Sequence, residues 1–447
     1  MKDFYSSRSF CLALAFIPFL MLLMHVALSY HPYPLWDHLD IITLLERYYN
    51  NSLTFYDLFE PYGGHWRAGG YFISIPVAIF TGWNTLYECL ASILFATAAF
   101  TVLAKSVKNS YNNAGINSHF YILLPLLSLF VFSLDQSGNW LWGFQVAVSM
   151  SIFFSFVTIA LLCIDEIRFY HTLLAASFTL LGTLCATTSL LLLPIGLLIL
   201  IVHPHISNKD KLFNIFIWIV CSFLIVYYYY IVVYQHTDLK SEQYKDLVKL
   251  SVYLVVFILN YIGSAITRFA DDLAPLFTII GICLALWSWF RLIKHYKIHY
   301  WHITPYASYM LYGLGSAFLT AIGRQEFGTD QAFVSRYISF SNFFWIGFIP
   351  LIVMLYAKMA DSSIYSEKTM RSLVIILSVI TIMKIANGFQ VANKNSNISK
   401  VKEKTWIEIS KNYPDYDKEM LKSLYWNQNI AAHYVDIMHE HKLGPFR

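Results

Sequence analysis

Long apolar runs separated by short polar segments account for most of the chain. Most of these runs approach or reach the ~20 residues that an α-helix needs to cross a bilayer. They cover residues 9–30, 86–104, 120–134, 143–163, 213–234, 251–266, 276–290, 304–322, 338–356 and 372–389. The pattern predicts an all-α polytopic membrane protein with about 10–12 membrane helices.

Two further apolar segments do not fit a simple crossing. Residues 72–80 are too short to cross alone, so we expect them to dip into the membrane or to lead into the next helix. Residues 171–202 are too long for one regular helix, and the polar sequence CATTS at 185–189 interrupts them. We therefore expect two short membrane segments that meet at a turn.

Composition supports a membrane protein. Mean hydropathy is +0.52, and 57% of the residues are hydrophobic. Only 13% are charged, against about 25% in average soluble proteins. The net charge of +4 is too small to indicate a nucleic-acid partner. The six cysteines fall in or beside apolar runs without CxxC spacing, so we interpret them as buried apolar side chains.

The basic residues predict the orientation. Lys2 and Arg8 precede the first run, which places the N-terminus in the cytoplasm behind an uncleaved signal anchor. The loop at residues 31–71 is then external. Counting every run as a full crossing puts the basic segment 291–302 outside as well. One run, either 171–202 or 251–266, must therefore cross differently.

The first external loop carries the most informative polar pattern. Its sequence LWDHLDIITLLER predicts a short amphipathic helix, in which Asp37 and Asp40 lie on one face. The opposite face carries apolar side chains, namely Leu35, Leu39, Ile42 and Leu45. Two carboxylates held at a membrane surface suggest chemistry on a substrate that arrives through lipid.

Two other polar stretches are predicted on the same external side. They are DQSGNWLWGFQ at 135–145, which we expect to begin with a short loop, and GRQEFGTDQAFVSRY at 323–337. Polar groups that converge on one face of an apolar bundle are what a membrane-embedded active site requires.

The order of these stretches resembles bacterial membrane proteins of the GT-C glycosyltransferase superfamily. The resemblance rests on the acid-bearing first loop, the GGHWR sequence at 63–67, NWLWGFQ and GRQEFGTDQAFVSRY. It runs from about Trp36 to Phe348 and implies a GT-C-like catalytic domain. We place this domain at residues 1–389, with the tail at 390–447 as a small external appendage. The resemblance also implies inverting transfer of a sugar from a polyprenyl-phosphate donor to a cell-surface glycan or lipid acceptor.

The resemblance assigns the catalytic base to the first loop. A carboxylate within hydrogen-bond reach of an acceptor hydroxyl can take its proton. Asp37 or Asp40 can serve, and we favour Asp37 because it lies nearer the end of the first membrane run. The alternative is that the two acids only complement the dipole of the short helix.

The leaving phosphate requires cations at the membrane surface. Arginine pairs with phosphate oxygens through a planar fork, so we expect Arg324, Arg336 and Arg67 to bind the donor phosphate. Alternatively, these arginines bind ordinary lipid head groups or snorkel to the interface.

Further substrate contacts are expected from side chains in the same stretches: His65, Trp66, Trp142, Gln145 and Gln331. Tryptophan also forms belts at bilayer interfaces, which is the alternative for Trp66 and Trp142. No histidine or acidic residue has metal-ligand spacing, so no metal site or other cofactor is predicted. The sequence leaves open whether a divalent cation assists.

Two other functions stay open. An O-antigen polymerase or ligase also uses lipid-linked sugar, but is expected to centre on arginines in later loops. A lipid-linked oligosaccharide flippase is expected to carry ionisable residues within its membrane helices, and the apolar runs here are nearly free of them. We favour a glycosyltransferase of surface-polysaccharide or O-antigen modification in the bacterial inner membrane, with its active site facing the periplasm.

Overall fold

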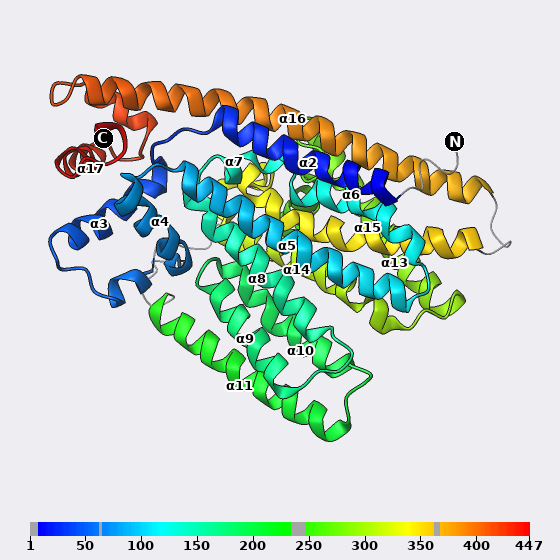
Figure 1. Ribbon diagram of the computed structural model, residues 1–447. Helices are drawn as coiled ribbons and strands as arrows, with labels where there is room; N and C mark the ends of the chain where they lie inside the picture. The colour runs from blue at the N-terminus through cyan, green and yellow to red at the C-terminus, as the bar shows by residue number, and fades with distance from the viewer. Residues whose placement is uncertain (1–7, 62–64, 234–246, 362–366) are drawn as a thin grey trace.

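The computed structural model describes residues 8–61, 65–233, 247–361 and 367–447, and these residues form helices without any strand (Figure 1). The first half contains α2 (Arg8–Ser29), α3 (Ile42–Tyr49), α4 (Ala68–Thr81), α5 (Leu86–Asn113), α6 (Phe120–Val131), α7 (Ser137–Trp140), α8 (Val146–Leu162) and α9 (Phe169–Thr183). The second half contains α10 (Leu192–Val202), α11 (Asn208–Val232), α12 (Leu247–Gly263), α13 (Ala274–Phe290), α14 (Thr304–Gly323), α15 (Ile338–Asp361), α16 (Glu367–Lys411) and α17 (Gln428–Glu440).

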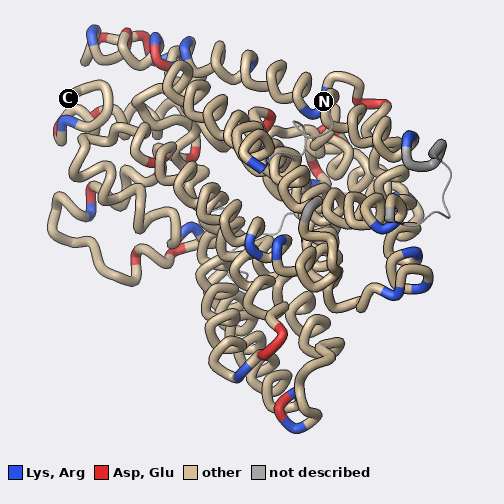
Figure 2. Tube along the Cα trace, turned by 45° about the vertical axis from the view of Figure 1, so that its right-hand side comes forward, with Lys and Arg blue, Asp and Glu red and all other residues tan. Residues whose placement is uncertain are grey.

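Many of these helices have the length and apolar composition needed to span a membrane. In the described residues, 8 helical segments are long and apolar enough to cross a membrane. Three shorter apolar helices accompany them, in the segments Ala68–Thr81, Thr187–Val202 and Val248–Gly263. Figure 2 shows the charged residues gathered mainly toward the ends of the helices, with long uncharged stretches between them. The expected all-α polytopic membrane protein is confirmed.

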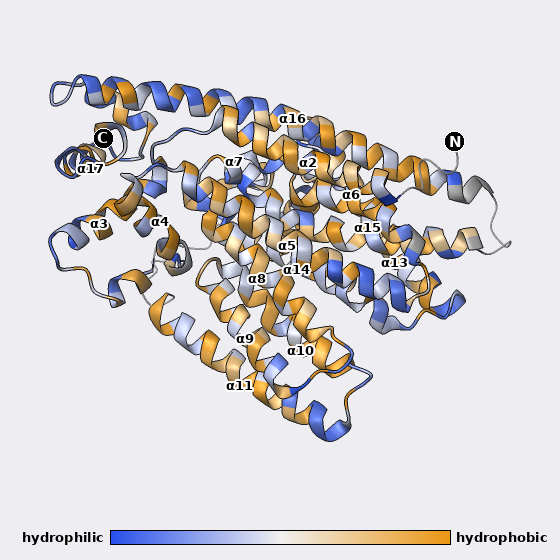
Figure 3. Cartoon of the chain, in the orientation of Figure 1, coloured by the Kyte–Doolittle hydropathy of each residue, from blue (hydrophilic) through white to orange (hydrophobic). Residues whose placement is uncertain are grey.

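Helix α15 forms the centre of the bundle, and α11 lies at its edge. The whole apolar window of α15 is buried inside the protein, whereas only 11% of the α11 window is buried. The outer face of α11 exposes large apolar side chains such as Phe213, Phe216 and Phe223 (Figure 3). Such a surface requires lipid as its solvent.

Glycine allows α14 and α15 to pack closely. A Cβ atom on Gly313 would lie 2.7 Å from the backbone nitrogen of Phe344, and one on Gly347 would lie 2.3 Å from the carbonyl oxygen of Tyr306. Small residues at helix contacts are typical of membrane bundles, because association there depends on close packing. This contact fixes α14 and α15, whose outer ends carry the predicted arginines.

The two irregular apolar segments behave as predicted. Residues 72–80 belong to the short helix α4, and residues 171–202 are divided between α9 and α10 by a break at 184–186. Both α9 and α10 are anchored at the end away from this break. There the Trp301 indole donates a hydrogen bond of 2.9 Å to Asp165, and the Tyr300 hydroxyl donates one of 2.9 Å to the carbonyl of Val202. The basic segment 291–302 therefore lies at the opposite end of these helices from the break.

The stretch that begins DQSGNW differs from its expected form. It is not an exposed loop but a series of short helical turns, Leu134–Gln136, α7 and Gly143–Gln145, most of whose side chains are buried. The reason is an ion pair of 2.7 Å between Asp135 and Lys384 of α16, both fully buried. Asn342 and Asn387 add hydrogen bonds to this pair. The charge of Lys384, which lies within the apolar run 372–389, is thus paired with a carboxylate inside the protein.

The C-terminal region packs on the first external loop. Helix α16 continues through residue 390 to Lys411, so the expected boundary between membrane domain and tail lies inside one helix. Figure 1 shows α16 running beside α2 and carrying the chain's red C-terminal end to the region of α3 and α4. A second hydrophobic core joins Leu39 and Leu45 of the first loop to Trp406, Leu421 and Val435 of the tail.

Candidate functional site

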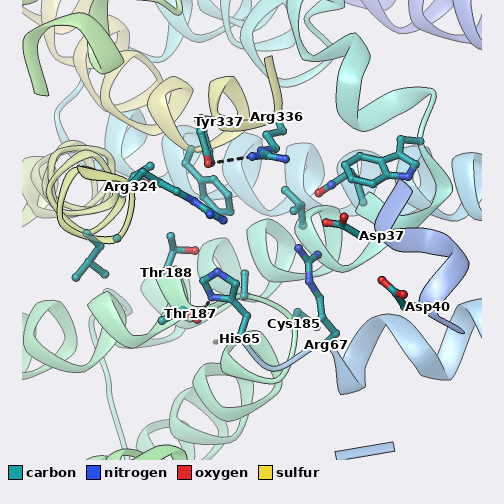
Figure 4. Close-up of a pocket in the computed structure, with 18 of the residues that line it drawn as sticks. Asp37, Asp40, His65, Arg67, Cys185, Thr187, Thr188, Arg324, Arg336 and Tyr337 are labelled. Carbon is teal, nitrogen blue, oxygen red and sulfur yellow. Dashed lines mark hydrogen bonds between the residues drawn. The ribbon is translucent and has the colours of Figure 1, made fainter. Parts of the chain in front are cut away.

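A cavity of about 620 Å³ opens where the first loop, the α9–α10 break, the outer ends of α14 and α15, and the tail meet (Figure 4). Its charged and polar lining includes Asp37, Asp40, His65, Arg67, Gln145, Thr187, Thr188, Arg324, Arg336 and Tyr337. Apolar and aromatic side chains, among them Trp142, Val148, Leu319, Phe340 and Trp426, complete it. The volume lies within the range of about 300–1,000 Å³ that is typical of ligand pockets.

The acids of this cavity stand on a short helix that the sequence pattern predicts. A 3₁₀ turn at Trp36–Ile41 leads into α3, and the four apolar positions of the expected stripe, Leu35, Leu39, Ile42 and Leu45, are all buried. Burial of that stripe turns the other face, with Asp37 and Asp40, toward the cavity. The apolar pattern therefore sets the direction of both carboxylates.

The two carboxylates differ in their surroundings. Oδ1 of Asp40 accepts hydrogen bonds from the hydroxyls of Tyr425 and Tyr434 in the tail, the second at 3.0 Å. The Asp37 side chain forms no hydrogen bond or ion pair with any other described residue. Asp37 can therefore accept a proton from a substrate, whereas Asp40 is already engaged by two protein donors.

Two arginines face these acids from the later part of the chain. Arg324 follows the end of α14, and Arg336 lies in the 3₁₀ turn that precedes α15. Between them the backbone turns at Gly328, whose φ of +71° is strained for residues with a side chain. Among the described residues neither guanidinium forms an ion pair; Arg336 contacts the Tyr337 hydroxyl at 3.4 Å. These two groups can bind an anion.

Arg67 and His65 line the cavity from the start of α4. The guanidinium of Arg67 lies 4.5 Å from the centre of the Phe144 ring. Nδ1 of His65 is 2.8 Å from the Thr187 hydroxyl, which in turn is 3.0 Å from the hydroxyl of Tyr229. Burial and the three pocket arginines lower the pKa of His65 to about 3, so this ring is neutral at ordinary pH. The glycine pair that precedes it, at 63 and 64, lies outside the described residues.

The break between α9 and α10 forms one wall of the cavity. The amide of Gly69 donates a hydrogen bond of 3.0 Å to the carbonyl of Leu184, the last residue before the turn. A Cβ atom on Gly69 would lie 2.2 Å from the sulfur of Cys185, so only glycine allows α4 this close. The contact brings Thr187 and Thr188 into the lining.

The other expected substrate contacts divide into two groups. Trp142 and Gln145 line the cavity, and the Trp142 indole donates a hydrogen bond of 3.0 Å to the carbonyl of Leu35. Trp66 is fully buried, and its indole donates a hydrogen bond of 3.2 Å to the carbonyl of Phe59. Neither Trp66 nor Gln331 belongs to the lining.

Some residues in and near the cavity are missing from the sequence-based predictions. Tyr425 and Trp426 belong to the tail, whose position over the first loop depends on long-range packing. Glu88 is fully buried and does not line the cavity. It pairs at 3.0 Å with His38, which lies between the two candidate acids in the sequence. A membrane run that contains an acid at its first turn was the available signal for Glu88, because a charge in such a place requires a partner.

Charge is unevenly distributed in the cavity. Figure 4 shows Asp37 and Asp40 on one side and Arg324 on the other, with Arg67 and Arg336 between them. The cationic side can hold a phosphate and the acidic side can hold hydroxyl groups. No group of three or more His, Cys, Asp and Glu side chains in the described residues has an arrangement that could hold a metal ion.

Comparisons with known proteins leave the family open. No family model and no curated protein matches the chain. The crystal structure of an Archaeoglobus fulgidus oligosaccharyltransferase, tethered to an acceptor peptide containing the NVT sequon, aligns with a TM-score of 0.44 at 12% sequence identity. The alignment covers 93% of this chain but only 59% of the other, so this chain spans well under two thirds of that protein. A likeness at this level carries no inference about function.

Proposed function

We propose that this membrane protein is an inverting glycosyltransferase that moves a sugar from a polyprenyl-phosphate donor to an acceptor hydroxyl. The observation that carries this proposal is the shared cavity of Asp37, Arg324 and Arg336. A carboxylate without a side-chain partner among the described residues faces two guanidinium groups that form no ion pair with those residues. This pairing matches a reaction in which a hydroxyl loses a proton while a phosphate departs.

The reaction is a single displacement. Asp37 takes the proton of the acceptor hydroxyl as that oxygen attacks the anomeric carbon of the donor sugar. The bond from this carbon to the phosphate oxygen breaks, and its electron pair leaves with the polyprenyl phosphate. Attack opposite the leaving group inverts the configuration at the anomeric carbon, and the proton ends on Asp37.

The arginines stabilise the departing group. Negative charge increases on the phosphate as the bond breaks, and Arg324 and Arg336 can neutralise it through bidentate contacts. His65, which is neutral, can exchange a hydrogen bond with the sugar or the phosphate without adding charge. Arg67 lies between the acids and Arg324 in Figure 4, and we assign it to the donor phosphate as well.

A lipid donor suits the position of the cavity. Leu319, Val148 and Phe340 of the membrane helices α14, α8 and α15 line it beside the arginines. A polyprenyl chain in the bilayer can therefore deliver its phosphate to this depth while an acceptor enters from the aqueous side. We place the protein in the bacterial inner membrane with this side facing the periplasm, and the acceptor among cell-surface glycans or lipids.

Purified protein in vesicles, supplied with polyprenyl-phosphate monosaccharides and candidate acceptors, tests the proposal. Transfer of one sugar is the expected result, and Asp37→Asn should lower the rate by about 10²–10⁴-fold. Asp330→Asn, an exposed acid of the same region outside the cavity, is the matched control. Full activity of Asp37→Asn would remove the assigned base. Joining of oligosaccharide blocks would indicate a polymerase or ligase, and movement of lipid-linked sugar without transfer would indicate a flippase.

Membrane topology gives an independent test. Reporter fusions after residues 51 and 328 should place both segments on the external side. Opposite locations would contradict the shared cavity and, with it, the proposed reaction.

A further inference from the structure

A turn of the C-terminal tail borders the acidic side of the cavity, next to Asp40. Tyr425 and Trp426 lie between the 3₁₀ turn Lys418–Ser423 and helix α17, and both line the cavity. The side chain of Asn427 caps α17 by accepting hydrogen bonds from the backbone amides of Asn429 at 3.0 Å and Ile430 at 3.3 Å. On the other side of the turn, the ammonium group of Lys402 donates a hydrogen bond to the carbonyl of Ser423. The turn that presents Trp426 is thus fixed on both sides.

Trp426 is exposed in an unusual setting. Its side chain is 72% exposed although it borders the cavity. Its neighbours Lys422 and Glu419 form an exposed ion pair of 2.6 Å, and Figure 3 shows the tail as largely hydrophilic. Trp426 is thus a large exposed aromatic side chain in a polar tail, beside a cavity that it lines.

Trp36 of the first loop is attached to the same turn. Its backbone amide donates a hydrogen bond of 2.8 Å to the carbonyl of Leu424. Its φ of +50° is uncommon for a bulky residue, so the contacts around Trp36 hold its backbone in a strained conformation. The Trp36 ring, 37% exposed, meets the lining residue Trp142 edge to face at 5.2 Å between ring centres.

We propose that Trp426 and Trp36 form a binding subsite for a neutral sugar ring of the acceptor, which makes the acceptor a carbohydrate chain. The apolar C–H face of a sugar ring packs on an indole ring, while its hydroxyl groups stay available for hydrogen bonds. The adjacent carboxylates of Asp37 and Asp40 accept hydrogen bonds from hydroxyl groups and disfavour an anionic acceptor. This inference rests on the proposed transfer reaction and adds the class of acceptor to it.

The subsite is held at a fixed distance from the proposed base. Tyr425, the residue before Trp426, donates its hydroxyl hydrogen bond to Asp40, three positions after Asp37. The Trp406 indole donates a hydrogen bond of 2.9 Å to the carbonyl of Pro34, just before the acids. These hydrogen bonds hold the turn that carries Trp426 on the first loop. A sugar ring bound to Trp426 would therefore lie at a fixed position relative to Asp37.

The test is acceptor kinetics with Trp426→Ala and Trp36→Ala, using a neutral oligosaccharide acceptor and a polyprenyl-phosphate sugar donor. The KM for the acceptor should rise about tenfold, the loss expected for one aromatic contact, and by far more than any change in donor KM. Trp426→Tyr should recover part of the loss, because it keeps an aromatic face. Tyr56→Ala is the matched control, since Tyr56 is an 84% exposed aromatic residue of the first loop that does not line the cavity.

Direct binding separates this inference from the proposed reaction. In protein labelled with 5-fluorotryptophan, a neutral oligosaccharide should shift the ¹⁹F resonance that disappears in Trp426→Phe. A shift without any sugar transfer would keep the subsite and reject the proposed reaction. Transfer with an unchanged acceptor KM in Trp426→Ala, or an unshifted Trp426 resonance at saturating acceptor, would overturn the subsite. If Trp36→Ala does not fold, Trp426→Ala alone decides.

Discussion

The hydroxyl of Tyr434 donates a hydrogen bond of 3.0 Å to Oδ1 of Asp40, a residue 394 positions earlier in the chain. Tyr425 donates to the same oxygen, so two side chains of the tail hold one carboxylate of the first loop. Burial and the nearby Asp40 carboxylate raise the pKa of Tyr434, which keeps its hydroxyl a proton donor. The acidic side of the cavity is therefore complete only when the tail has folded onto the loop.

Removal of this contact should weaken the docking of the tail. A hydrogen bond to a charged group contributes about 1.5–3 kcal/mol, so Tyr434→Phe is expected to destabilise the protein by roughly that amount. The double variant Tyr434→Phe/Tyr425→Phe should lose more stability, because it removes both bonds to Asp40. The comparison is Tyr413→Phe, which removes a 3.1 Å bond to Asp436 inside the tail; that bond is exposed, so water can replace it and the loss should be smaller. Thermal unfolding in detergent measures the difference. Equal losses in Tyr434→Phe and Tyr413→Phe would contradict a special role for Asp40.

Substitution of the donor-binding arginines should affect donor affinity first. Arg324→Lys and Arg336→Lys keep the charge but lose the planar fork, so we expect the donor KM to rise about tenfold in each. Lys422→Gln, which removes an exposed cation of the tail, should leave the donor KM unchanged. Competition by free polyprenyl phosphate gives the same comparison without turnover. A donor KM insensitive to both substitutions would show that the phosphate binds elsewhere.

His65 predicts a pH dependence of stability with a definite sign. Its pKa is about 3 in the folded protein and 6.5 without the fold, so the unfolded chain binds the proton more readily. This group should leave stability unaffected above about pH 6.5 and reduce it by about 1.4 kcal/mol per pH unit between there and pH 3. Melting curves at pH 7 and pH 5 should show a larger decrease for the natural protein than for His65→Gln. Parallel decreases would indicate that His65 is protonated in the folded state.

Removing one member of the buried pair Asp135–Lys384 should destabilise the protein more than neutralising both members. Lys384→Met leaves the carboxylate of Asp135 buried without its ammonium partner, which should cost about 3–5 kcal/mol. Lys384→Met combined with Asp135→Asn should cost less, because the buried carboxylate is removed together with its ammonium partner. Lys394→Met, an exposed position on the same helix, serves as control. The yield of monodisperse protein and its melting temperature are the measurements, and an additive double variant would argue against the pairing.

Much of the fold follows from local pattern. The apolar runs predict most of the membrane helices because each one needs only its own composition to favour lipid. The stripe of Leu35, Leu39, Ile42 and Leu45 predicts which way Asp37 and Asp40 point. The polar CATTS sequence predicts a break, and α9 and α10 do separate there.

The remaining features depend on contacts between distant segments. Asp135 reads as part of an external loop until its partner Lys384, 249 residues later, is placed beside it. Trp66 and Trp142 have similar sequence surroundings, yet only Trp142 reaches the cavity. Tyr425 and Trp426 occur in a polar tail without a local signal, since only the packing of α16 and Trp406 against the first loop brings them to the acids.

Helix α16 has 45 residues, which corresponds to a rod of about 68 Å at 1.5 Å per residue. The helix is fixed in the bundle at Lys384, within its first half, and its C-terminal end leads to the turn with Trp426. Each residue inserted between them would rotate that turn by about 100° around the helix axis. The number of residues from 385 to 411 therefore determines the direction in which the tail leaves the helix. Even one extra alanine there would separate the tyrosines from Asp40, although no contacting residue had changed.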